Sequence, residues 1–434
     1  MKKILFQIAF LFFVFQSTKA QEVLRLEDAV QIALKNNYDI RLASTDLKID
    51  EANVGVANAG MLPKVDATFT KNNSIQNSKQ TQSNGVEREL DNAKNNTTSY
   101  GVNLGWTVFD GLKMFARYDQ LRSLQKQGET ELKLTVMTKV SSVMSSYYDL
   151  VQQQHLLKAL DTTIVISKQR LKTADNRFII GKASKLEVLN AQVDLNADIS
   201  NLLKQKEVFQ NAKISFNELL ARETDTDFTV VEMGKIDENL QLTELRELVK
   251  SQNPELQLAL INKKVAESNL KQVKANRYPV VRLNAGYNFN ESQSSLGFTS
   301  QSTARGLNYG VSASINVFNG FLQHRNEKIA KLQVENSTTL IEQQTKTIDT
   351  QLAMAYQTYK TNLELMKLEK ENEAIAKRNL EITLDKFKIG TIPTIEFRNA
   401  QENYITAIAR HTTAKFQAKI SEVVLQEITG SIKF

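Results

Sequence analysis

Few side chains in this 434-residue chain could do catalytic or metal-binding chemistry. The three histidines, His155, His324 and His411, lie far apart and lack the short spacing typical of metal ligands. Cysteine is absent, which excludes disulfides, thiolate metal sites and cysteine nucleophiles. No serine, lysine or carboxylate pair lies in a recognisable catalytic motif. We therefore expect neither an enzyme nor a protein that holds a metal or a cofactor.

The carboxylates that stand out belong to a segment that occurs twice. Residues 178–192 and 387–401 agree at seven of fifteen positions when they are aligned with an offset of 209. Chance composition would give roughly one identity. Glu187 and Glu396 occupy the same place in the two segments. The repeated segment indicates duplication of a large unit of the chain.

The duplication extends along most of the chain. The offset of 209 also pairs Tyr100-Gly-Val with Tyr309-Gly-Val, whereas nearer the start of each half an offset of 216 pairs Pro63 with Pro279. The difference of seven residues must be absorbed between Pro63 and Tyr100. The polar stretch 71–96 lies there and predicts a loop. We interpret the chain as two tandem structural repeats, residues 21–225 and 226–434.

Residues 1–20 have the pattern of a secretory signal peptide. Lys2 and Lys3 precede an apolar core from Ile4 to Phe15, and the segment ends at Ala20. This core is too short to span about 30 Å of hydrocarbon as a helix. The overall composition, 41% hydrophobic and 24% charged, excludes a polytopic helical membrane protein and wholesale disorder. The net charge of +7 falls to about +4 when Lys2, Lys3 and Lys19 of this segment are removed, which is too mild to indicate nucleic-acid binding.

Four segments alternate between apolar and polar residues, which predicts strands near 65–74, 98–109, 281–291 and 306–318. Strands that are apolar on one face and polar on the other are typical of a transmembrane β-barrel. A half-buried sheet in a soluble protein shows the same alternation. The signal peptide favours the membrane, as do aromatic residues within the strands that are typical of membrane interfaces. These barrel aromatic residues are Tyr100, Trp106, Tyr287 and Tyr309.

Long helices fill the rest of each repeat. A helical pattern runs from Leu26 to about Gly60, and residues 112–180 contain one glycine and no proline. At 1.5 Å per residue the latter segment could extend for about 100 Å. A seven-residue spacing of apolar residues from Val136 to Phe178 predicts a coiled-coil seam. A second helix from about 184 to 220 would form a hairpin with the first one.

The strand count predicts an oligomer if the sheet lies in a membrane. Four strands are too few to close a barrel, and an open sheet edge is not tolerated in lipid. Even-numbered bacterial barrels begin at eight strands. Two copies would leave a lumen filled by side chains, whereas three would give twelve strands and room for a pore. A conduit follows from this architecture, and an active site does not.

The order of elements resembles the TolC-type outer-membrane efflux proteins. Each repeat has a helix, two strands and a long helix hairpin, and the segments Phe178-x-x-Gly181 and Phe387-x-x-Gly390 resemble that family's periplasmic helix-tip motif. The resemblance covers essentially residues 22–434. It implies a mainly α protein with a small membrane β part, a homotrimer whose 12-stranded β-barrel continues into a long α-helical barrel across the periplasm.

The resemblance also implies partners and site residues. The duct would pass substrates from a periplasmic adaptor and an inner-membrane transporter of the RND, ABC or MFS class to the outside, in efflux or type I secretion. The periplasmic aperture would be formed by Glu396, Asn399 and Glu187. The family's second acidic position is Asn399 here, and Ile392 stands where some members have a basic residue. The adaptor-binding helix tips would include Phe178, Gly181, Lys182, Phe387 and Gly390.

Two other functions are compatible with the sequence. One is a secreted trimeric coiled-coil scaffold or adhesin with a soluble β-head, and the other is an envelope enzyme with helical insertions. The duplicated strand pairs favour the duct, because a scaffold does not need strands with one face suited to lipid. The expected location is accordingly the bacterial outer membrane.

Overall fold

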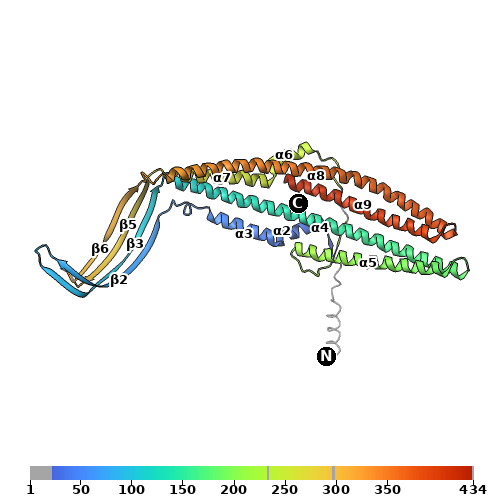
Figure 1. Ribbon diagram of the computed structural model, residues 1–434, viewed down its shortest axis with the longest axis horizontal. Helices are drawn as coiled ribbons and strands as arrows, with labels where there is room; N and C mark the ends of the chain where they lie inside the picture. The colour runs from blue at the N-terminus through green and yellow to red at the C-terminus, as the bar shows by residue number, and fades with distance from the viewer. Residues whose placement is uncertain (1–21, 232–233, 296–298, 433–434) are drawn as a thin grey trace, which may run out of the picture. The chain divides into compact units, whose positions relative to one another are not determined.

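The computed structural model describes residues 22–231, 234–295 and 299–432 (Figure 1). The predicted signal peptide, residues 1–20, lies outside the described residues. The protein is 66% helical with a small strand content, which confirms the mainly α fold. It divides into two compact units. The first contains residues up to Thr45, Glu131–Gln257 and residues from Gln344 onward; the second contains Asp46–Thr130 and Leu258–Gln343.

The first unit is built from helices and one small sheet. Two helix hairpins dominate it, α4 with α5 and α8 with α9 (Figure 1). Parts of α3, α4, α7 and α8 belong to the second unit. The helices are α2 (Leu26–Asn36), α3 (Tyr38–Asn53), α4 (Lys113–Ile179), α5 (Lys185–Leu219), α6 (Leu242–Gln252), α7 (Pro254–Ala275), α8 (Leu322–Ile389) and α9 (Thr394–Thr429). Strands β1 (Glu22–Leu24) and β4 (Phe228–Val230) pair in parallel, a contact that sequence patterns did not indicate.

The seven-residue apolar spacing of α4 lies in the core of this unit. Val143 and Leu150 are fully buried, and Phe216 of α5 and Phe228 of β4 belong to the same cluster. The Tyr147 hydroxyl donates to the Leu24 carbonyl oxygen at 3.0 Å. A buried phenol must find such a partner, because an unsatisfied polar group costs free energy. The predicted seam is therefore a packed core along this part of α4.

Two buried tyrosines make the stability of the helical unit sensitive to alkali. Burial, followed by the charge of Glu422, raises the pKa of Tyr148 to about 12. Burial, followed by the charge of Asp237, raises the pKa of Tyr359 to about 12. The ordinary value is 10.0. The unfolded chain would lose these protons first, so the stabilisation is complete below pH 10 and disappears as the pH rises towards 12.

We expect the free energy of unfolding to fall steeply between pH 10 and pH 12. The double variant Tyr148→Phe/Tyr359→Phe should flatten this fall, because phenylalanine has no proton to lose. Tyr38, which is 66% exposed, supplies the control Tyr38→Phe, whose alkaline profile should match the parent's. Denaturant unfolding at several pH values checks the prediction, and equal slopes for the parent and the double variant would contradict it.

The long helical pattern near the start of each repeat is interrupted, which the sequence analysis did not predict. The chain breaks at Asn37 between α2 and α3 and again at Asn253 between α6 and α7. Asn37 Oδ1 accepts from the Asp39 amide, and its Nδ2 donates to the Leu219 carbonyl at the end of α5. Asn253 makes the corresponding bond, from Nδ2 to Ile428 at the end of α9. An asparagine that caps the following helix competes with continued helix.

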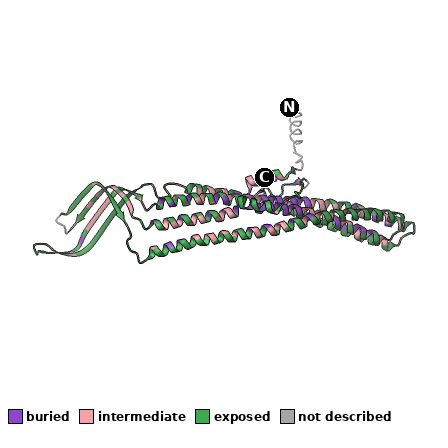
Figure 2. Cartoon of the chain, turned by 90° about the horizontal axis from the view of Figure 1, so that it is seen from above, coloured by how far each residue is buried: buried purple, intermediate pink, exposed green. Residues whose placement is uncertain are grey.

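The second unit contains an antiparallel sheet in the order β2-β3-β5-β6. Its strands are β2 (Lys64–Thr81), β3 (Glu87–Phe109), β5 (Val280–Ser294) and β6 (Gln301–Ser314). Most of their residues are exposed, as the green strands of Figure 2 show. Each pair of strands is adjacent in the sequence except β3 and β5, which join the two repeats. Strands β2 and β6 are the edges of this sheet.

The polar stretch 71–96 was predicted as a loop, and that prediction is wrong. Most of it extends β2 and β3 into a longer hairpin, which turns at residues 82–86. Cross-strand polar pairs maintain the pairing, including a 2.7 Å ion pair between Lys79 and Glu87. A bulge follows Gln76, where the Asn92 amide donates to Asn77 Oδ1. Backbone pairing needs no apolar alternation, so hydrophobic periodicity alone missed these residues.

Candidate functional site

The two hairpin ends have the same backbone design. Gly181 and Gly390 have φ values of 72° and 82°, the left-handed conformation that glycine adopts without strain. The Lys182 amide donates to the Arg177 carbonyl at 2.7 Å, and the Thr391 amide donates to Lys386 at 3.0 Å. These bonds close the last turn of α4 and of α8. The glycine of the repeated motif is therefore required by the turn itself, and both glycines are exposed.

The two phenylalanines of the motif have different surroundings. Phe387 is 1% exposed and stacks on Phe397, with ring centroids 5.1 Å apart. Phe178 is 38% exposed, and the Lys185 ammonium lies 5.2 Å from the centre of its ring. Phe387 therefore stabilises the second hairpin end from within. Phe178 and the exposed Lys182 present an accessible surface at the first hairpin end.

The three residues predicted for an aperture also differ from one another. Glu187 accepts a 2.6 Å hydrogen bond from Thr394 Oγ1 and lies 3.5 Å from Arg177. It thus links α5 to the first turn of α9. Glu396 and Asn399 are exposed on α9. Their side chains are available to solvent, whereas the carboxylate of Glu187 is already engaged in joining the two hairpins.

A buried polar cluster, which the sequence analysis missed, joins the two hairpins behind these residues. Arg398 Nη1 of α9 lies 3.0 Å from Asp198 Oδ2 of α5, and its Nε lies 4.0 Å from Asp194. Ser167 of α4 donates to Asp198 at 2.5 Å and accepts from Gln401 Nε2 at 2.7 Å. The Arg398 and Asp198 side chains are only 12% and 5% exposed. We call these five residues the inter-hairpin cluster.

The charges of the inter-hairpin cluster stabilise one another. Burial alone would lower the pKa of Arg398, but the hydrogen bond and charge of Asp198, with the charges of Asp194 and Glu402, raise it instead. The guanidinium therefore stays protonated and compensates Asp198, while Asp194 also pairs with Arg170 of α4 at 2.5 Å. One sequence signal could have revealed the cluster. Arg398 stands where the first repeat has Leu189, and Asp198 stands where the second repeat has Ala407. Each repeat thus has one charged residue where the other has an apolar one, and the two charges are opposite.

The four barrel aromatic residues predicted from sequence share one face of the sheet. Strand pairing places Ala67, Val102, Tyr287 and Leu307 side by side, and the next row contains Val65, Leu104, Ala285 and Tyr309. Tyr100 stacks on Phe289 with ring centroids 4.9 Å apart, and Trp106 Nε1 donates to the Met61 carbonyl at 2.8 Å. One face of the sheet is thus apolar over all four strands.

The opposite face of the sheet is polar and rich in asparagine and glycine. Its rows contain Thr68, Gly101, Asn288 and Gly306, then Asp66, Asn103, Gly286 and Asn308. Asn288 Nδ2 donates to Asn103 Oδ1 at 3.2 Å across the strands. A sheet with one face suited to hydrocarbon and one suited to water is what a membrane pore requires.

In the described part of the chain, no three His, Cys, Asp or Glu side chains are grouped so that they could hold a metal ion. His411 is paired with Glu373 on α8 at 2.5 Å. None of the helices in the described ranges is both long and apolar enough to cross a membrane.

Most of the chain matches a known protein family. The model of the family described as "Outer membrane efflux protein" matches residues 29–222 and 245–431. Protein CyaE of Bordetella pertussis is 22% identical over 421 residues, which cover 94% of this chain and 84% of CyaE. The probable efflux pump outer membrane protein TtgC of Pseudomonas putida is 23% identical over 428 residues, with coverages of 93% and 82%.

Solved structures share the fold at low sequence identity. The outer-membrane channel OprN superposes with a TM-score of 0.77 at 18% identity, covering 94% of this chain and 90% of OprN. The outer membrane protein VceC from Vibrio cholerae superposes with a TM-score of 0.75 at 15% identity, with coverages of 93% and 96%. These similarities extend over both repeats rather than over one hairpin or the sheet alone.

Proposed function

This chain belongs to the outer membrane efflux protein family, and on that premise we propose that three copies of it form one exit duct. The protein is an outer-membrane channel for efflux or secretion that extends into the periplasm. The observation that carries the trimer is the sheet, because it is apolar on one face and open at β2 and β6. Three such sheets would supply twelve strands, enough for a closed barrel with a pore.

Unpartnered apolar stripes on the helices also support association of several copies. Along α8, an exposed apolar residue recurs every seventh position from Leu368 to Ile389, with exposures between 50% and 75%. Along α5, Leu186, Leu189 and Val193 are exposed by 64%, 54% and 65%. Heptad spacing of this kind is what a neighbouring helix packs against in a coiled coil. We infer that the stripe of α8 meets that of α5 in the next copy. The exposed α8 residues are Leu368, Ile375, Ile382 and Ile389.

We further propose that the hairpin ends bind a periplasmic adaptor. Channels of this family form trimers and work with periplasmic adaptors and inner-membrane transporters. In this chain the accessible residues at the ends are Phe178, Gly181, Lys182 and Gly390, whereas buried Phe387 would act by shaping the second end. The transporter would belong to the RND, ABC or MFS class. We infer no enzymatic activity, because the family is one of channels.

The periplasmic aperture is proposed to be lined by Glu396 and Asn399, with Glu187 positioning the first turn of α9. Three copies of an exposed Glu396 around one axis would repel one another and attract cations. Asn399 would contribute a neutral ring next to them. Glu396 is charged and Asn399 is neutral, so the selectivity of the aperture for cations would depend on a single ring of carboxylates.

We expect Glu396→Gln to weaken block by divalent cations by about tenfold, equivalent to about 1.4 kcal/mol of lost attraction. The substitution keeps the shape of the side chain and removes three charges from the trimer. Single-channel recording with divalent cations added to one side measures the effect. The matched control is Glu371→Gln, an exposed glutamate of α8 far from the turn, and it should leave the block unchanged. An unchanged block in Glu396→Gln would refute the acidic ring.

Membrane fractionation tests the proposed function. The protein should sediment with outer-membrane material, resist extraction by high salt and be released by detergent as an oligomer of three chains. Release by salt alone, as a soluble protein, would instead favour the secreted scaffold and would contradict the duct.

A further inference from the structure

The polar face of the sheet carries few charged side chains. From the helix end of the sheet to the row of Ser74, the charged residues on this face are Lys64 and Asp66 of β2 and Arg282 of β5. Most of the other residues there are asparagine, glycine, serine or threonine, which are short and uncharged. In the proposed duct this face lines the pore, because the opposite face is apolar. These three side chains would therefore supply the fixed charge of the barrel lumen.

The acid and the arginine stand at equivalent places in the two repeats. The offset of 216 converts Asp66 into Arg282, and the offset of 209 converts Asn103 into Ser312. The strand pairing agrees with both offsets, since Asp66 pairs with Asn103 and Arg282 pairs with Ser312. One position of the repeat thus has a negative charge in the first copy and a positive charge in the second.

The acid has a partner on its own strand, whereas the arginine does not. Lys64 Nζ lies 3.0 Å from Asp66 Oδ1, because residues two apart on a strand share a face. Position 280, two residues before Arg282, is a valine. Among the described residues of one chain, no ion pair involves Arg282. Its neighbours across the strands are the hydroxyl side chains of Thr107 and Ser312. Arg282 therefore leaves one positive charge per chain on this face.

The neighbouring acids are too distant or too engaged to compensate Arg282. The row of Asp66 contains Gly286 of β5, so Asp66 is two strands and four residues away from Arg282. These steps place the two backbone positions roughly 16 Å apart. Such a separation exceeds the Debye length of about 8 Å at physiological salt. Asp110, which follows β3, accepts from the Met114 amide at the start of α4, where the helix dipole stabilises its charge.

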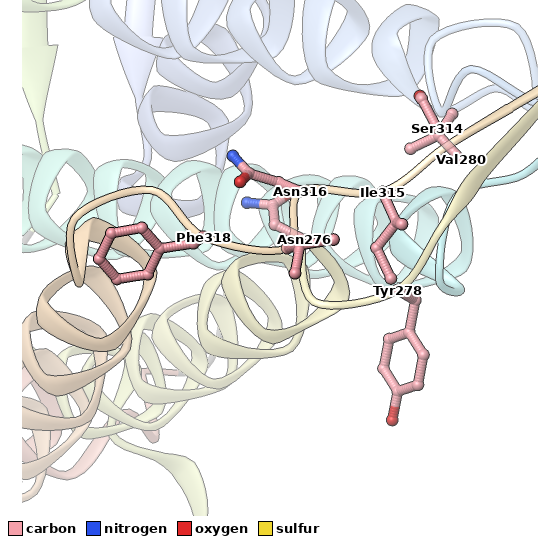
Figure 3. Close-up of a pocket in the computed structure, with 8 residues that line it drawn as sticks. Asn276, Tyr278, Val280, Ser314, Ile315, Asn316 and Phe318 are labelled. Atoms are coloured by element: carbon pink, nitrogen blue, oxygen red, sulfur yellow. The ribbon is translucent and has the colours of Figure 1, made fainter.

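The guanidinium of Arg282 is accessible, and the space beside it is open. Strand β6 ends at Ser314 rather than at residue 318, where apolar alternation predicted its end. Val280 and Ser314 form the next pair on the polar face, and both line an open cavity of about 770 Å³. Figure 3 shows these two residues at one end of the cavity, with the amides of Asn276 and Asn316 beyond them. Arg282 is exposed, so its five N–H donors are free to meet a ligand.

We propose that the Arg282 side chains of three copies form a ring in the barrel lumen that binds multivalent anions. The inference rests on the trimeric duct of the proposed function, and it names a class of cargo: molecules with two or more carboxylate or phosphate groups. A guanidinium binds such groups through two parallel hydrogen bonds. Three of them around one axis add their attraction, and a lumen with low-dielectric walls strengthens it. The ring proposed for Glu396 acts on cations, so the duct has a separate site for each sign of charge.

Single-channel recording with tripolyphosphate tests the ring. In a planar bilayer at about 0.1 M salt, where charges are only partly screened, tripolyphosphate added to each side in turn should block the parent channel from at least one side. Arg282→Gln should raise the concentration that gives half-block by at least about tenfold, because it removes three charge-assisted binding groups from the trimer. Arg282→Lys keeps the charge and should keep most of the block.

Two further variants serve as controls. Arg305→Gln removes an exposed arginine from the opposite face of the sheet, at the β6 position that pairs with Phe289, and it should leave the block unchanged. Asp66→Asn removes the partner of Lys64 and adds to the positive charge of the lumen. It should therefore lower the concentration of tripolyphosphate that gives half-block. The open-channel conductance of each variant shows that it has folded and assembled.

The outcomes separate this inference from the proposed function. Loss of block in Arg282→Gln, with the block retained in Arg305→Gln, would support the ring. A conducting parent that tripolyphosphate does not block, or equal block in the parent and Arg282→Gln, would overturn the ring and leave the exit duct intact. A parallel loss in Arg305→Gln would also overturn it, because the block would then depend on overall charge. A parent that does not conduct would contradict the duct itself, and the ring with it.

Discussion

Replacing Arg398 by alanine is expected to lower the free energy of unfolding by about 3–5 kcal/mol, because it leaves a buried carboxylate without its counter-charge. Asp198 is 5% exposed and has the Arg398 guanidinium at 3.0 Å, and the Asp194 carboxylate lies nearby. Asp194 keeps its 2.5 Å ion pair with Arg170 of α4, whereas Asp198 could not recover its solvation without opening the contact between α5 and α9. We therefore expect Arg398→Ala to loosen the two hairpins as well as to destabilise the fold.

A matched control exists on the same helix. Arg410 of α9 pairs with Glu369 of α8 at 3.1 Å, but its side chain is 54% exposed. Exposed ion pairs of this kind contribute about 0–1 kcal/mol, so Arg410→Ala should cost little. Guanidinium unfolding of the detergent-solubilised protein, followed by circular dichroism, measures both variants. Similar small losses for the two would show that the inter-hairpin cluster does not hold the hairpins together.

A double variant separates the lost attraction between Arg398 and Asp198 from the cost of leaving Asp198 buried without a counter-charge. Arg398→Met/Asp198→Asn removes the buried charge together with its partner, and it should recover part of the stability that Arg398→Ala loses. If the double variant were less stable than the parent by the sum of the losses of the two single variants, the two residues would act independently. Because the two side chains lie 3.0 Å apart, we expect the losses not to be additive, and additive losses would contradict the prediction.

Phe387→Ala is expected to lower the free energy of unfolding by about 3–5 kcal/mol, as is usual when a buried phenylalanine is truncated. Its ring is 1% exposed and packs on Phe397 within a cluster that also contains Leu380, Ile392 and Ala400. Loss of this ring would leave a cavity beneath the second hairpin end. The turn at Gly390 should then lose its fixed conformation.

The repeat supplies the control for this prediction. Phe178 occupies the same place in the first hairpin but is 38% exposed, so Phe178→Ala should cost about 1 kcal/mol, a typical value for a point substitution. Chemical unfolding compares the two variants directly. Adaptor binding should show the opposite order at concentrations where both proteins are folded, because Phe178 is the accessible ring. Equal stability losses would mean that the different burial of the two rings has no energetic consequence.

The sequence predicted the elements whose residues follow a strict period. Apolar residues every seven positions identified α4, and alternation identified the apolar face of the four strands, because both patterns record burial against one surface. The breaks at Asn37 and Asn253 were missed because hydrophobic periodicity does not record the asparagine cap, and because each asparagine also donates to a carbonyl more than 170 residues away. The long β2–β3 hairpin was missed because polar strands carry no hydrophobic period.

At the candidate site too, local sequence patterns predicted the backbone turns but not the contacts between the hairpins. The turn motif predicted both hairpin ends, because a glycine in the left-handed conformation has a sequence signature. The phenylalanine of the motif has different surroundings in the two hairpins, and the motif does not predict this difference. Phe387 is buried against Phe397, whereas Phe178 is 38% exposed. The inter-hairpin cluster depends on contacts among α4, α5 and α9, which no local pattern encodes. Comparison of the repeats marks Arg398 and Asp198 as departures, but their contact depends on how α5 packs against α9.

The central claim is that the chain forms a transmembrane exit channel, and planar-bilayer conductance of the detergent-extracted protein tests it most directly. A small, cation-selective conductance that divalent or trivalent cations block from one side is the predicted result. No conductance, from a protein that also remains soluble after the detergent is removed, would contradict the account.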